Sequence, residues 1–531
     1  MMKAKGVAFL VGILLLCSIL MLIDTNTLVA DGPEASWKTV VTVVPQSTGT
    51  HASSIACLPN GSLAIVYKTG VQGDFGASNI KITKSHDGGL TWSTPTTLID
   101  SLSYICSGST SVTFLDPALH VDGDRTYFVF CAKPPSASDY SDPSWLYLWW
   151  SDDNATTWSG TGGSPDYVNF TSIYPSWNEP YDCGLANPTA FQTLNGSWVI
   201  PAWFSTGAGF DSVYSDCFIS YPGEDMTSIS GWHLLSDETG GESIGYDDSH
   251  HVLEPAIAYL SNHSWLCHYR ASSNSGNSPE VCLGLNNGSS WSGYSDFTYG
   301  DREDSRTDLM VFSSNVTYGL MDGSHEIYHD KQRMLFSWVN SSSRNSMDVA
   351  LSYDDGATWP ITKNLDSGCG AYSDMTVTNN GTIVVEYSNS ANENENNRIK
   401  VALFNLEWLT DGNDYLDEII DVTNFVSING KDNNSIVQDN HRFFNWSKID
   451  EATGYSIRID DSISMDSPWF QLDNITVSDG NCTNSFLNTS ASASPYDYNY
   501  WENETTCFFY LPYVYNCTEY GYDYYQVRYY S

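Results

Sequence analysis

The sequence Ser85-His-Asp-Gly-Gly-Leu-Thr-Trp92 recurs later in the chain as Ser352-Tyr-Asp-Asp-Gly-Ala-Thr-Trp359. Two weaker copies lie between them, SDDNATTW at Ser151–Trp158 and GLNNGSSW at Gly284–Trp291. The copies start at positions 85, 151, 284 and 352, which are 66, 133 and 68 residues apart. Because the middle interval is about twice the others, a fifth and degenerate copy is expected in the region that ends at Trp232.

Each copy, called a turn box below, has the composition of a tight turn between two strands. Its Ser and Asp side chains can bond backbone groups of the turn, its Gly permits a positive φ, and its Trp can pack beneath the turn. This composition indicates a structural role for the box rather than a catalytic one. A chain that repeats one small β-sheet at a regular interval builds a propeller.

The region 37–410 alternates predicted strands with turns and shows almost no helical periodicity. The boxes define four periods, and the flanking segments Trp37–Lys84 and Gly368–Leu409 supply about two more blades. The sequence therefore predicts an all-β chain with a six-bladed β-propeller over residues 37–410. The strand Lys38–Val44 is expected to close the ring beside the last blade.

The character of the sequence changes after residue 410. Phe443–Asp460 contains Trp446 and then an alternating strand from Tyr455, a pattern that resembles fibronectin type III modules. Residues 421–531 are predicted to form a smaller β-sandwich domain of the immunoglobulin or fibronectin III kind. This domain could bind carbohydrate, contact a cell-surface layer or space the propeller from it.

Composition excludes several classes of protein. With 41% hydrophobic and 14% aromatic residues the chain can bury large cores, which argues against global disorder. The formal net charge of −41 argues against nucleic acid and against anionic membrane surfaces as partners. An anionic substrate would need a local basic pocket, and only 22 Lys and Arg residues are present to build it.

The N-terminus and the acceptor sites for glycans both predict export. Lys3 and Lys5 precede an apolar run over Gly6–Ile23, so residues 1–30 are predicted to be a signal peptide, with an uncleaved anchor as the alternative. Sixteen Asn-x-Ser/Thr triplets follow, which are typical of exported glycoproteins but also arise by chance in a chain rich in Ser, Thr and Asn. The expected location is secreted or extracellular and surface-associated, with possible attachment to a cell surface. Cys267 and Cys282 flank a predicted hairpin and could form a disulfide.

Together these features resemble the sialidase (neuraminidase) superfamily of six-bladed propellers. Ser343–Trp359 resembles the blade that carries that family's third substrate arginine, and Gly370-Ala-Tyr-Ser-Asp374 resembles its nucleophile segment. Leu253-Glu-Pro-Ala-Ile-Ala258, with Arg270 on the next strand, resembles the blade with its glutamate and second arginine. The resemblance covers residues 45–410.

The resemblance implies a set of catalytic roles that are chemically coherent. The anomeric carbon of sialic acid bears a carboxylate, which would repel a carboxylate nucleophile, and sialidases use a tyrosine instead. Tyr372 would be the nucleophile and Glu254 the base that takes its proton, because a phenol with a pKa near 10 needs such help. Arg270 and Arg344 would hold the substrate carboxylate in a fork, and Asp74 would be the acid that protonates the leaving oxygen.

Each of these residues also has an ordinary structural explanation. Tyr372 is one of 34 tyrosines, Arg344 could lie on the surface, and the turn around Asp74 is unremarkable.

The chain departs from the family pattern at two positions. His51 stands where the family's first arginine is expected, and an imidazole is cationic only below about pH 6.5. Glu386 lies two residues before the place of the late glutamate that steadies this arginine, where Ser388 stands. A spacing of two keeps Glu386 on the same face of a strand, so both residues are expected to belong to a remodelled substrate pocket.

The leading hypothesis is an exported sialidase-like exo-glycosidase that removes a terminal acidic sugar, sialic acid or a related one, with retention. Its partners would be glycoconjugates or polysaccharides with acidic sugars. The alternatives are a non-catalytic glycan-binding or adhesion propeller, which the missing arginine favours, and a propeller-type polysaccharide lyase. No cofactor is predicted, and the sequence has no metal-site motif.

Overall fold

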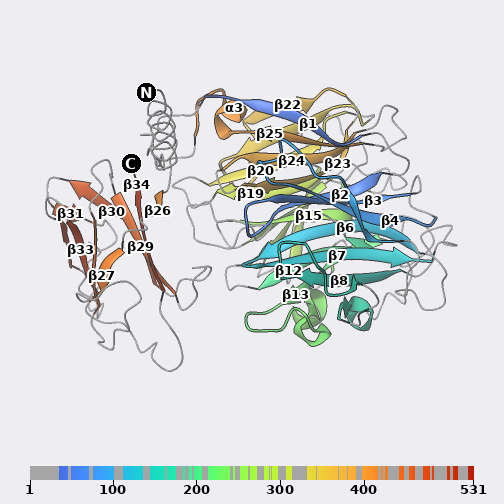
Figure 1. Cartoon of the computed structure of the whole chain (residues 1–531), viewed down its shortest axis with the longest axis horizontal. Helices are drawn as coiled ribbons and strands as arrows, with labels where there is room; N and C mark the ends of the chain where they lie inside the picture. Colours follow the sequence, from blue (N-terminus) through green and yellow to red (C-terminus); the bar gives the residue numbers. More distant parts are fainter. Residues whose placement is uncertain are drawn as a thin grey trace, which may run out of the picture.

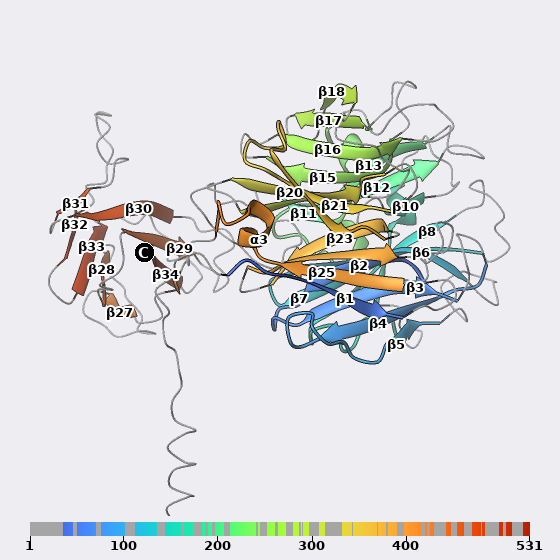
Figure 2. The same cartoon turned by 90° about the horizontal axis from the view of Figure 1, so that it is seen from above.

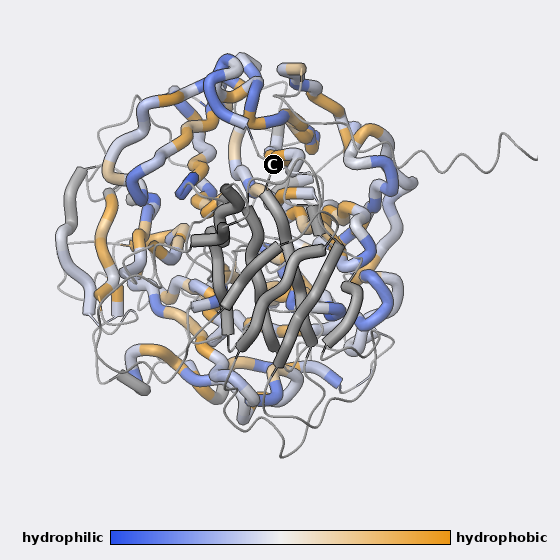
Figure 3. The backbone as a smooth tube through the Cα atoms, turned by 90° about the vertical axis from the view of Figure 1, so that its left-hand side faces the viewer, coloured by the Kyte–Doolittle hydropathy of each residue, from blue (hydrophilic) through white to orange (hydrophobic). Residues whose placement is uncertain are grey.

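A computed structural model of the chain contains six antiparallel blades around a central axis, as the turn boxes predict (Figure 1). Viewed end-on, the blades form a closed ring in which hydrophobic segments recur in every sector (Figure 3). The described residues are 35–45, 50–70, 76–100, 112–134, 144–161, 164, 166–174, 183–185, 190–193, 197–205, 213–239, 243–244, 252–260, 264–271, 280–285, 288, 290–296, 307–313, 332–341, 344–368, 370–378, 381–389, 398–415, 420–421, 425–428, 442–447, 454–460, 470–478, 481–483, 499–502, 506–511 and 524–530.

Each blade is a sheet in which consecutive strands of the chain lie side by side, from the central channel outward. From the innermost strand, the first three blades are β2(His51–Cys57), β3(Leu63–Thr69), β4(Asn79–Ser85), β5(Thr96–Ile99); β6(Thr113–Asp122), β7(Arg125–Lys133), β8(Trp145–Ser151), β9(Val168–Asn169); and β10(Cys183–Leu185), β12(Trp198–Ser205), β13(Val213–Ser220), β14(His233–Leu234), with β11(Phe191–Gln192) also on β12. The last three blades are β15(Val252–Tyr259), β16(Trp265–Ala271), β17(Glu280–Leu285), β18(Ser290–Asp296); β19(Asp308–Ser313), β20(Arg333–Val339), β21(Met347–Ser352), β22(Ile361–Asp366); and β23(Ala371–Val377), β24(Ile383–Asn389), β25(Arg398–Phe404), β1(Lys38–Val44).

The first strand of the chain completes the last blade, as expected from the sequence. β1 pairs antiparallel with β25, with Lys38 opposite Phe404 and Val41 opposite Val401 (Figure 2). The two ends of the ring are also joined beyond the strands, because the Trp37 N–H donates to Asn405 Oδ1 at 3.1 Å. The ring is thus closed by hydrogen bonds between segments that are far apart in the sequence.

The turn boxes form the turns that their composition predicts. In the first box Ser85 Oγ donates to Asp87 Oδ1 at 2.8 Å, the Gly89 N–H donates to Ser85 Oγ at 2.8 Å, and the Thr91 N–H donates to Asp87 Oδ1 at 2.9 Å. The hydrogen bonds from Thr91 hold the pKa of Asp87 at about 2. The degenerate copy in the third blade keeps its tryptophan, since Trp232 is buried and its Nε1 donates to a backbone carbonyl.

The core of the propeller is divided into layers between neighbouring blades. One layer joins Tyr67 and Ile65 of the first blade to Val384 and Leu403 of the last. Similar layers separate the first blade from the second and the second from the third, and a large one extends from the third blade to the sixth. Each blade therefore buries both of its faces, which explains why second strands such as β3 and β7 are buried along almost their whole length.

The innermost strands have an edge that no other strand covers, and side chains of neighbouring blades bond to it. Asp374 Oδ2 on β23 accepts from the Ile55 N–H of β2 at 2.7 Å. Asp308 Oδ2 on β19 accepts in the same way from the Met375 N–H of β23, also at 2.7 Å. Both carboxylates are buried, so these bonds satisfy backbone donors that would otherwise be costly to bury.

The end of the propeller is fixed by a buried ion pair. The chain leaves β25 through the short helix α3(Leu406–Thr410) and reaches Asp414. Arg333 binds Asp414 through Nε and Nη2, both at 2.7 Å, and the two side chains are 1% and 3% exposed. Tyr353 donates its hydroxyl to the same carboxylate at 2.8 Å. This cluster of three side chains, the exit clamp, ties the segment after the propeller to the fifth blade.

Beyond the propeller, short strands form two antiparallel sheets. One has the order β26(Ile420–Asp421), β34(Tyr524–Tyr530), β29(Gly454–Asp460), β30(Phe470–Ser478), β31(Asn481–Thr483). The other has the order β27(Phe425–Ile428), β28(Arg442–Ser447), β33(Thr506–Leu511), β32(Asn499–Glu502). The fibronectin III-like sandwich and the domain boundary at 421 stay predictions.

Two expectations about export meet the structure only in part. The predicted signal over residues 1–30 lies outside the described residues. Among the helices that are described, none is long and apolar enough to cross a membrane.

The suggested disulfide is not formed. Cys267 and Cys282 are directly opposite each other on β16 and β17, but both are buried free thiols.

The two glycines of the first turn box give a test of this turn. A Cβ on Gly89 would lie 2.8 Å from Leu403 Cδ2, whereas a Cβ on Gly88 would meet nothing within 4 Å. Both have a positive φ, which costs alanine roughly 1 kcal/mol. We expect Gly88→Ala to lower the free energy of unfolding by about that amount, and Gly89→Ala by about 1–3 kcal/mol more because Leu403 is held in the core. Urea unfolding measures both, and equal losses would contradict the predicted clash.

A buried carboxyl in the third blade predicts how stability depends on pH. Asp216 on β13 is 3% exposed, and burial raises its pKa to about 7. The folded state therefore binds a proton that the unfolded state, with a pKa near 4, has released, so this group makes folding less favourable as pH rises from about 4 to 7. Asp216→Asn should be more stable than the parent at pH 7.5, with the difference shrinking toward pH 4.

Urea unfolding at several pH values measures this difference, with Asp124→Asn in an exposed turn as the control for loss of a charge. A difference between Asp216→Asn and the parent that does not change with pH would show that Asp216 does not carry the effect.

Candidate active site

The inner strands of the second, fourth and sixth blades are interrupted at the same point near their beginnings. The pairing with the second strand skips from Leu115 to Ala118, from Leu253 to Ala256 and from Ala371 to Ser373. The residues at these bulges are Asp116, Glu254 and Tyr372, with φ values of 45°, 47° and 51°. A left-handed backbone is strained for such residues, and strain of this kind is concentrated at functional sites.

The topology carries the three bulge residues to one end of the channel. In a six-bladed ring the second, fourth and sixth blades alternate with the others, so equivalent positions on them are evenly spaced around the axis. All three bulges lie near the start of an inner strand, and inner strands all begin at the same end of a propeller. We call this end the mouth. The turn boxes follow the third strands of the blades and therefore lie at the opposite end.

Glu254 is held by the arginine that the sequence places beside it. Arg270 lies on β16, in register with Leu253, and its Nη1 donates to Glu254 Oε2 at 3.0 Å. The side chains are 12% and 11% exposed, so the pair is largely removed from water but open at one side. The contact holds the carboxylate and the guanidinium next to each other.

Tyr372 lies beside Arg344, the other arginine that the sequence predicts in the site. Arg344 Cζ lies 5.1 Å from the centroid of the Tyr372 ring, within the range of a cation–π contact. Arg344 itself has a φ of 46°, and its carbonyl accepts from the Gly370 N–H at 2.8 Å, which ties the segment before β21 to the start of β23. Tyr372 is 8% exposed, so the phenol is shielded on most sides.

Glu386 occupies a deeper position than the mouth. It is fully buried on β24, in register with Asp374, and accepts a hydrogen bond from Ser53 Oγ at 2.5 Å. Glu386 thus contacts β2, the strand that begins at His51, and has no surface exposed to a ligand. Its predicted place in the substrate pocket stays a prediction.

Two of the predicted residues are described incompletely or not at all. His51 is the first residue of β2 and lies opposite Lys68 on β3, but its side chain is outside the described part of the chain. Lys68 is fully buried. Asp74 also lies outside the described residues. The roles of His51 and Asp74 stay predictions.

Asp116 is the mouth residue that the sequence interpretation missed. Leu115-Asp-Pro-Ala118 matches Leu253-Glu-Pro-Ala256, and this repeat was the signal that could have revealed it. A Cβ on Gly184 would lie 2.6 Å from Asp116 Oδ2, so the inner strand of the third blade packs closely on this carboxylate. Any larger residue at position 184 would force Asp116 or Trp203 to move.

The pair Glu254–Arg270 predicts a measurable coupling. Removing one charge leaves the other partly buried without its partner, whereas removing both does not. We expect Glu254→Gln and Arg270→Met each to lower the free energy of unfolding. The two losses together should exceed the loss in the double variant by about 1 kcal/mol or more, which is the coupling energy of the pair. Urea unfolding of the four proteins measures it. Additive losses would mean that the contact contributes nothing.

Comparisons with known proteins agree with this architecture. A model of the BNR repeat-like domain matches residues 61–385. The Hadza microbial sialidase Hz136 is 19% identical, with a TM-score of 0.54 over 70% of this chain and 69% of that one. The intramolecular trans-sialidase of Ruminococcus gnavus is 15% identical, with a TM-score of 0.51 over 68% of this chain and 96% of that one. The leech intramolecular trans-sialidase is also 15% identical, at 0.51 over 72% and 71%. No curated protein sequence matches the chain.

Proposed function

We propose that this chain, which belongs to the BNR repeat-like domain family and so to the sialidase superfamily, is a retaining exo-glycosidase for a terminal acidic sugar. The observation that carries the proposal is the left-handed bulge that presents Asp116, Glu254 and Tyr372 at one end of the channel, with arginines beside two of them. A tyrosine with a neighbouring carboxylate suits attack on a carboxylate-bearing anomeric carbon, and guanidiniums suit binding of that carboxylate.

In the proposed first step, Tyr372 Oη attacks the anomeric carbon while the bond to the leaving oxygen breaks. Glu254 takes the proton from the phenol, and Asp74 donates a proton to the leaving oxygen. In the second step Asp74 takes a proton from water, the water oxygen replaces Tyr372 on the anomeric carbon, and Glu254 returns the proton to the phenolate. Two displacements on one carbon give overall retention.

The binding roles follow from charge. Arg344 and Arg270 are the cations for the substrate carboxylate, because a guanidinium can bind two carboxylate oxygens at once. His51 would complete this grip when it is protonated. Asp116, which is half-buried, would accept a hydrogen bond from a hydroxyl of the same sugar.

A second candidate function is glycan binding without hydrolysis. The specific observation in its favour is that His51 begins β2, where the family's first arginine is expected. A weaker grip on the carboxylate lowers catalysis more than it lowers binding, if that grip tightens in the transition state. For either function we propose that the protein is exported and acts on glycans at or outside a cell surface, on the basis of residues 1–30 and the Asn-x-Ser/Thr triplets.

The decisive variant is Tyr372→Phe. Removing the nucleophilic oxygen should lower release of a fluorogenic α-sialoside or α-uronide by at least about a thousandfold, because the covalent route is lost. Tyr387→Phe is the matched control, since Tyr387 is a buried tyrosine of the same blade whose hydroxyl donates to Asp366 at 2.9 Å. It should retain activity.

The outcomes separate the two functions. Activity in Tyr372→Phe equal to that of the parent would refute the tyrosine mechanism. No release by the parent protein on any acidic sugar, together with binding on a glycan array, would select the non-catalytic function. Thermal unfolding of each variant confirms that the fold is retained.

A further inference from the structure

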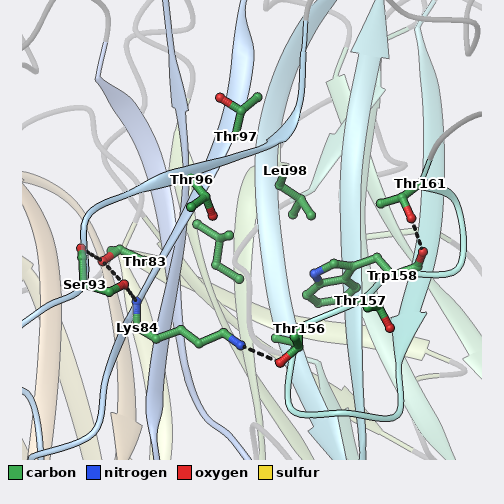
Figure 4. A pocket seen from close by; sticks show the side chains of 12 residues that line it. Thr83, Lys84, Ser93, Thr96, Thr97, Leu98, Thr156, Thr157, Trp158 and Thr161 are labelled. Atoms are coloured by element: carbon green, nitrogen blue, oxygen red, sulfur yellow. Dashed lines mark hydrogen bonds between the residues drawn. The ribbon is translucent and has the colours of Figure 1, made fainter.

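A cavity of about 360 Å³ opens between the first and second blades, far from the mouth (Figure 4). It is bounded by the end of β4, by β5 and by the turn box Ser151–Trp158 of the second blade. The third strands begin at the mouth and run to the turn boxes, so this cavity lies at the opposite end of the propeller. It is a separate site, and no role in the proposed reaction accounts for it.

The lining of the cavity is dominated by hydroxyl groups. Apolar side chains, Ile82, Leu98 and Ala155, form part of its wall. The hydroxyl-bearing residues are Thr83, Ser93, Thr96, Thr97, Thr156, Thr157 and Thr161. No Asp or Glu lines the cavity, although the chain has 63 acidic residues. A hydroxyl can both donate and accept, and the threonine methyls provide small apolar surfaces, which suits a ligand with many hydroxyl groups.

The one charged group in the lining is Lys84. Its Nζ donates to the Asn154 carbonyl at 2.6 Å and to Thr156 Oγ1 at 3.3 Å, which leaves one of its three N–H donors. Within the described residues it forms no ion pair, and the nearby carboxylate of Asp153 is bound by Thr157 Oγ1 at 2.7 Å. Burial lowers the pKa of Lys84, as expected of an ammonium that has lost part of its hydration. An anionic group of a ligand would supply the hydrogen-bond acceptor and the opposite charge for the ammonium of Lys84.

An indole ring also forms part of the wall of the cavity. Trp158 is 5% exposed, and among the described residues its Nε1 has no hydrogen-bond partner. Figure 4 shows the indole nitrogen on the edge turned toward Thr96 and Leu98. In the first box the equivalent Trp92 donates its Nε1 to the Gly89 carbonyl at 2.9 Å. The Trp158 N–H is itself buried, so this residue contributes the apolar surface of its ring to the cavity.

From these features we propose that the cavity is an accessory binding site for one acidic sugar unit, with the sugar carboxylate on Lys84 and the ring hydroxyls on the threonines. Its volume is at the lower end of the range of small-molecule sites, which fits a monosaccharide rather than a chain of sugars. Charge-assisted hydrogen bonds from an ammonium to a carboxylate supply the selectivity for acids. The site stands independently of catalysis, and it would let one molecule bind a glycan at two ends.

The experiment is a titration of the full chain with methyl β-D-glucuronide and with methyl β-D-glucoside, which differ only at C6. Calorimetry and saturation-transfer NMR report binding, and the protein carries Tyr372→Phe so that no turnover occurs. We expect Lys84→Met to weaken glucuronide binding about tenfold, in line with the loss of one charged hydrogen bond. Lys81→Met is the matched control, because Lys81 lies on the same strand with its side chain outside the lining.

A second variant protects the test against misfolding of the first. Thr96 is exposed at the rim, so Thr96→Trp should fill the cavity and remove the glucuronide site there, while thermal unfolding stays the same. Because the mouth is also proposed to bind an acidic sugar, the readout is the change in the glucuronide isotherm: an isotherm that neither Lys84→Met nor Thr96→Trp changes would overturn the proposal. So would equal affinity for the glucoside, or no binding of the glucuronide at all. Each result is read without activity, so it is distinguishable from failure of the proposed glycosidase function.

Discussion

The free edge of the innermost strands is the constraint on which the propeller depends. A strand that borders the channel has backbone donors that no further strand can satisfy. The chain answers with side chains from neighbouring blades: Asp308 bonds to β23, Asp374 bonds to β2, and Ser54 Oγ accepts from the Leu119 N–H of β6 at 2.9 Å. Because each bond joins two blades, the same groups that satisfy the edge also fix the blades to one another.

These bonds between the inner strands, called the inner belt, explain how the mouth can hold strained residues. Asp116, Glu254 and Tyr372 each have a left-handed backbone, which costs of order 1–3 kcal/mol unless the surroundings impose it. A few residues further along the same strands, the inner belt and the hydrophobic layers between neighbouring blades hold the backbone in place. The rest of each inner strand therefore holds its bulge residue in the strained conformation.

The sequence contained most of the architecture and only part of the site. The turn boxes predicted the blades, and the position of Lys38–Val44 predicted the closure, because both depend on local patterns. Asp116 escaped notice because one acid before a proline is unremarkable until the strands align it with Glu254. The burial of Glu386 and the free thiol of Cys267 depend on what neighbouring blades place against them, which no local pattern encodes.

The exit clamp has a mechanical consequence. β1 and β25 are antiparallel, with Lys38 opposite Phe404, so a pull on the two ends of the propeller would break their hydrogen bonds one at a time, as a zip opens. The buried contact of Arg333 with Asp414 lies on the chain between that seam and everything that follows it. Tension from the C-terminal side therefore loads the fifth blade first, and the seam is spared until the clamp gives way. Resistance to such a pull would rest on the exit clamp and on Lys363 of the same blade, which donates to the Trp408 carbonyl and to Asp411.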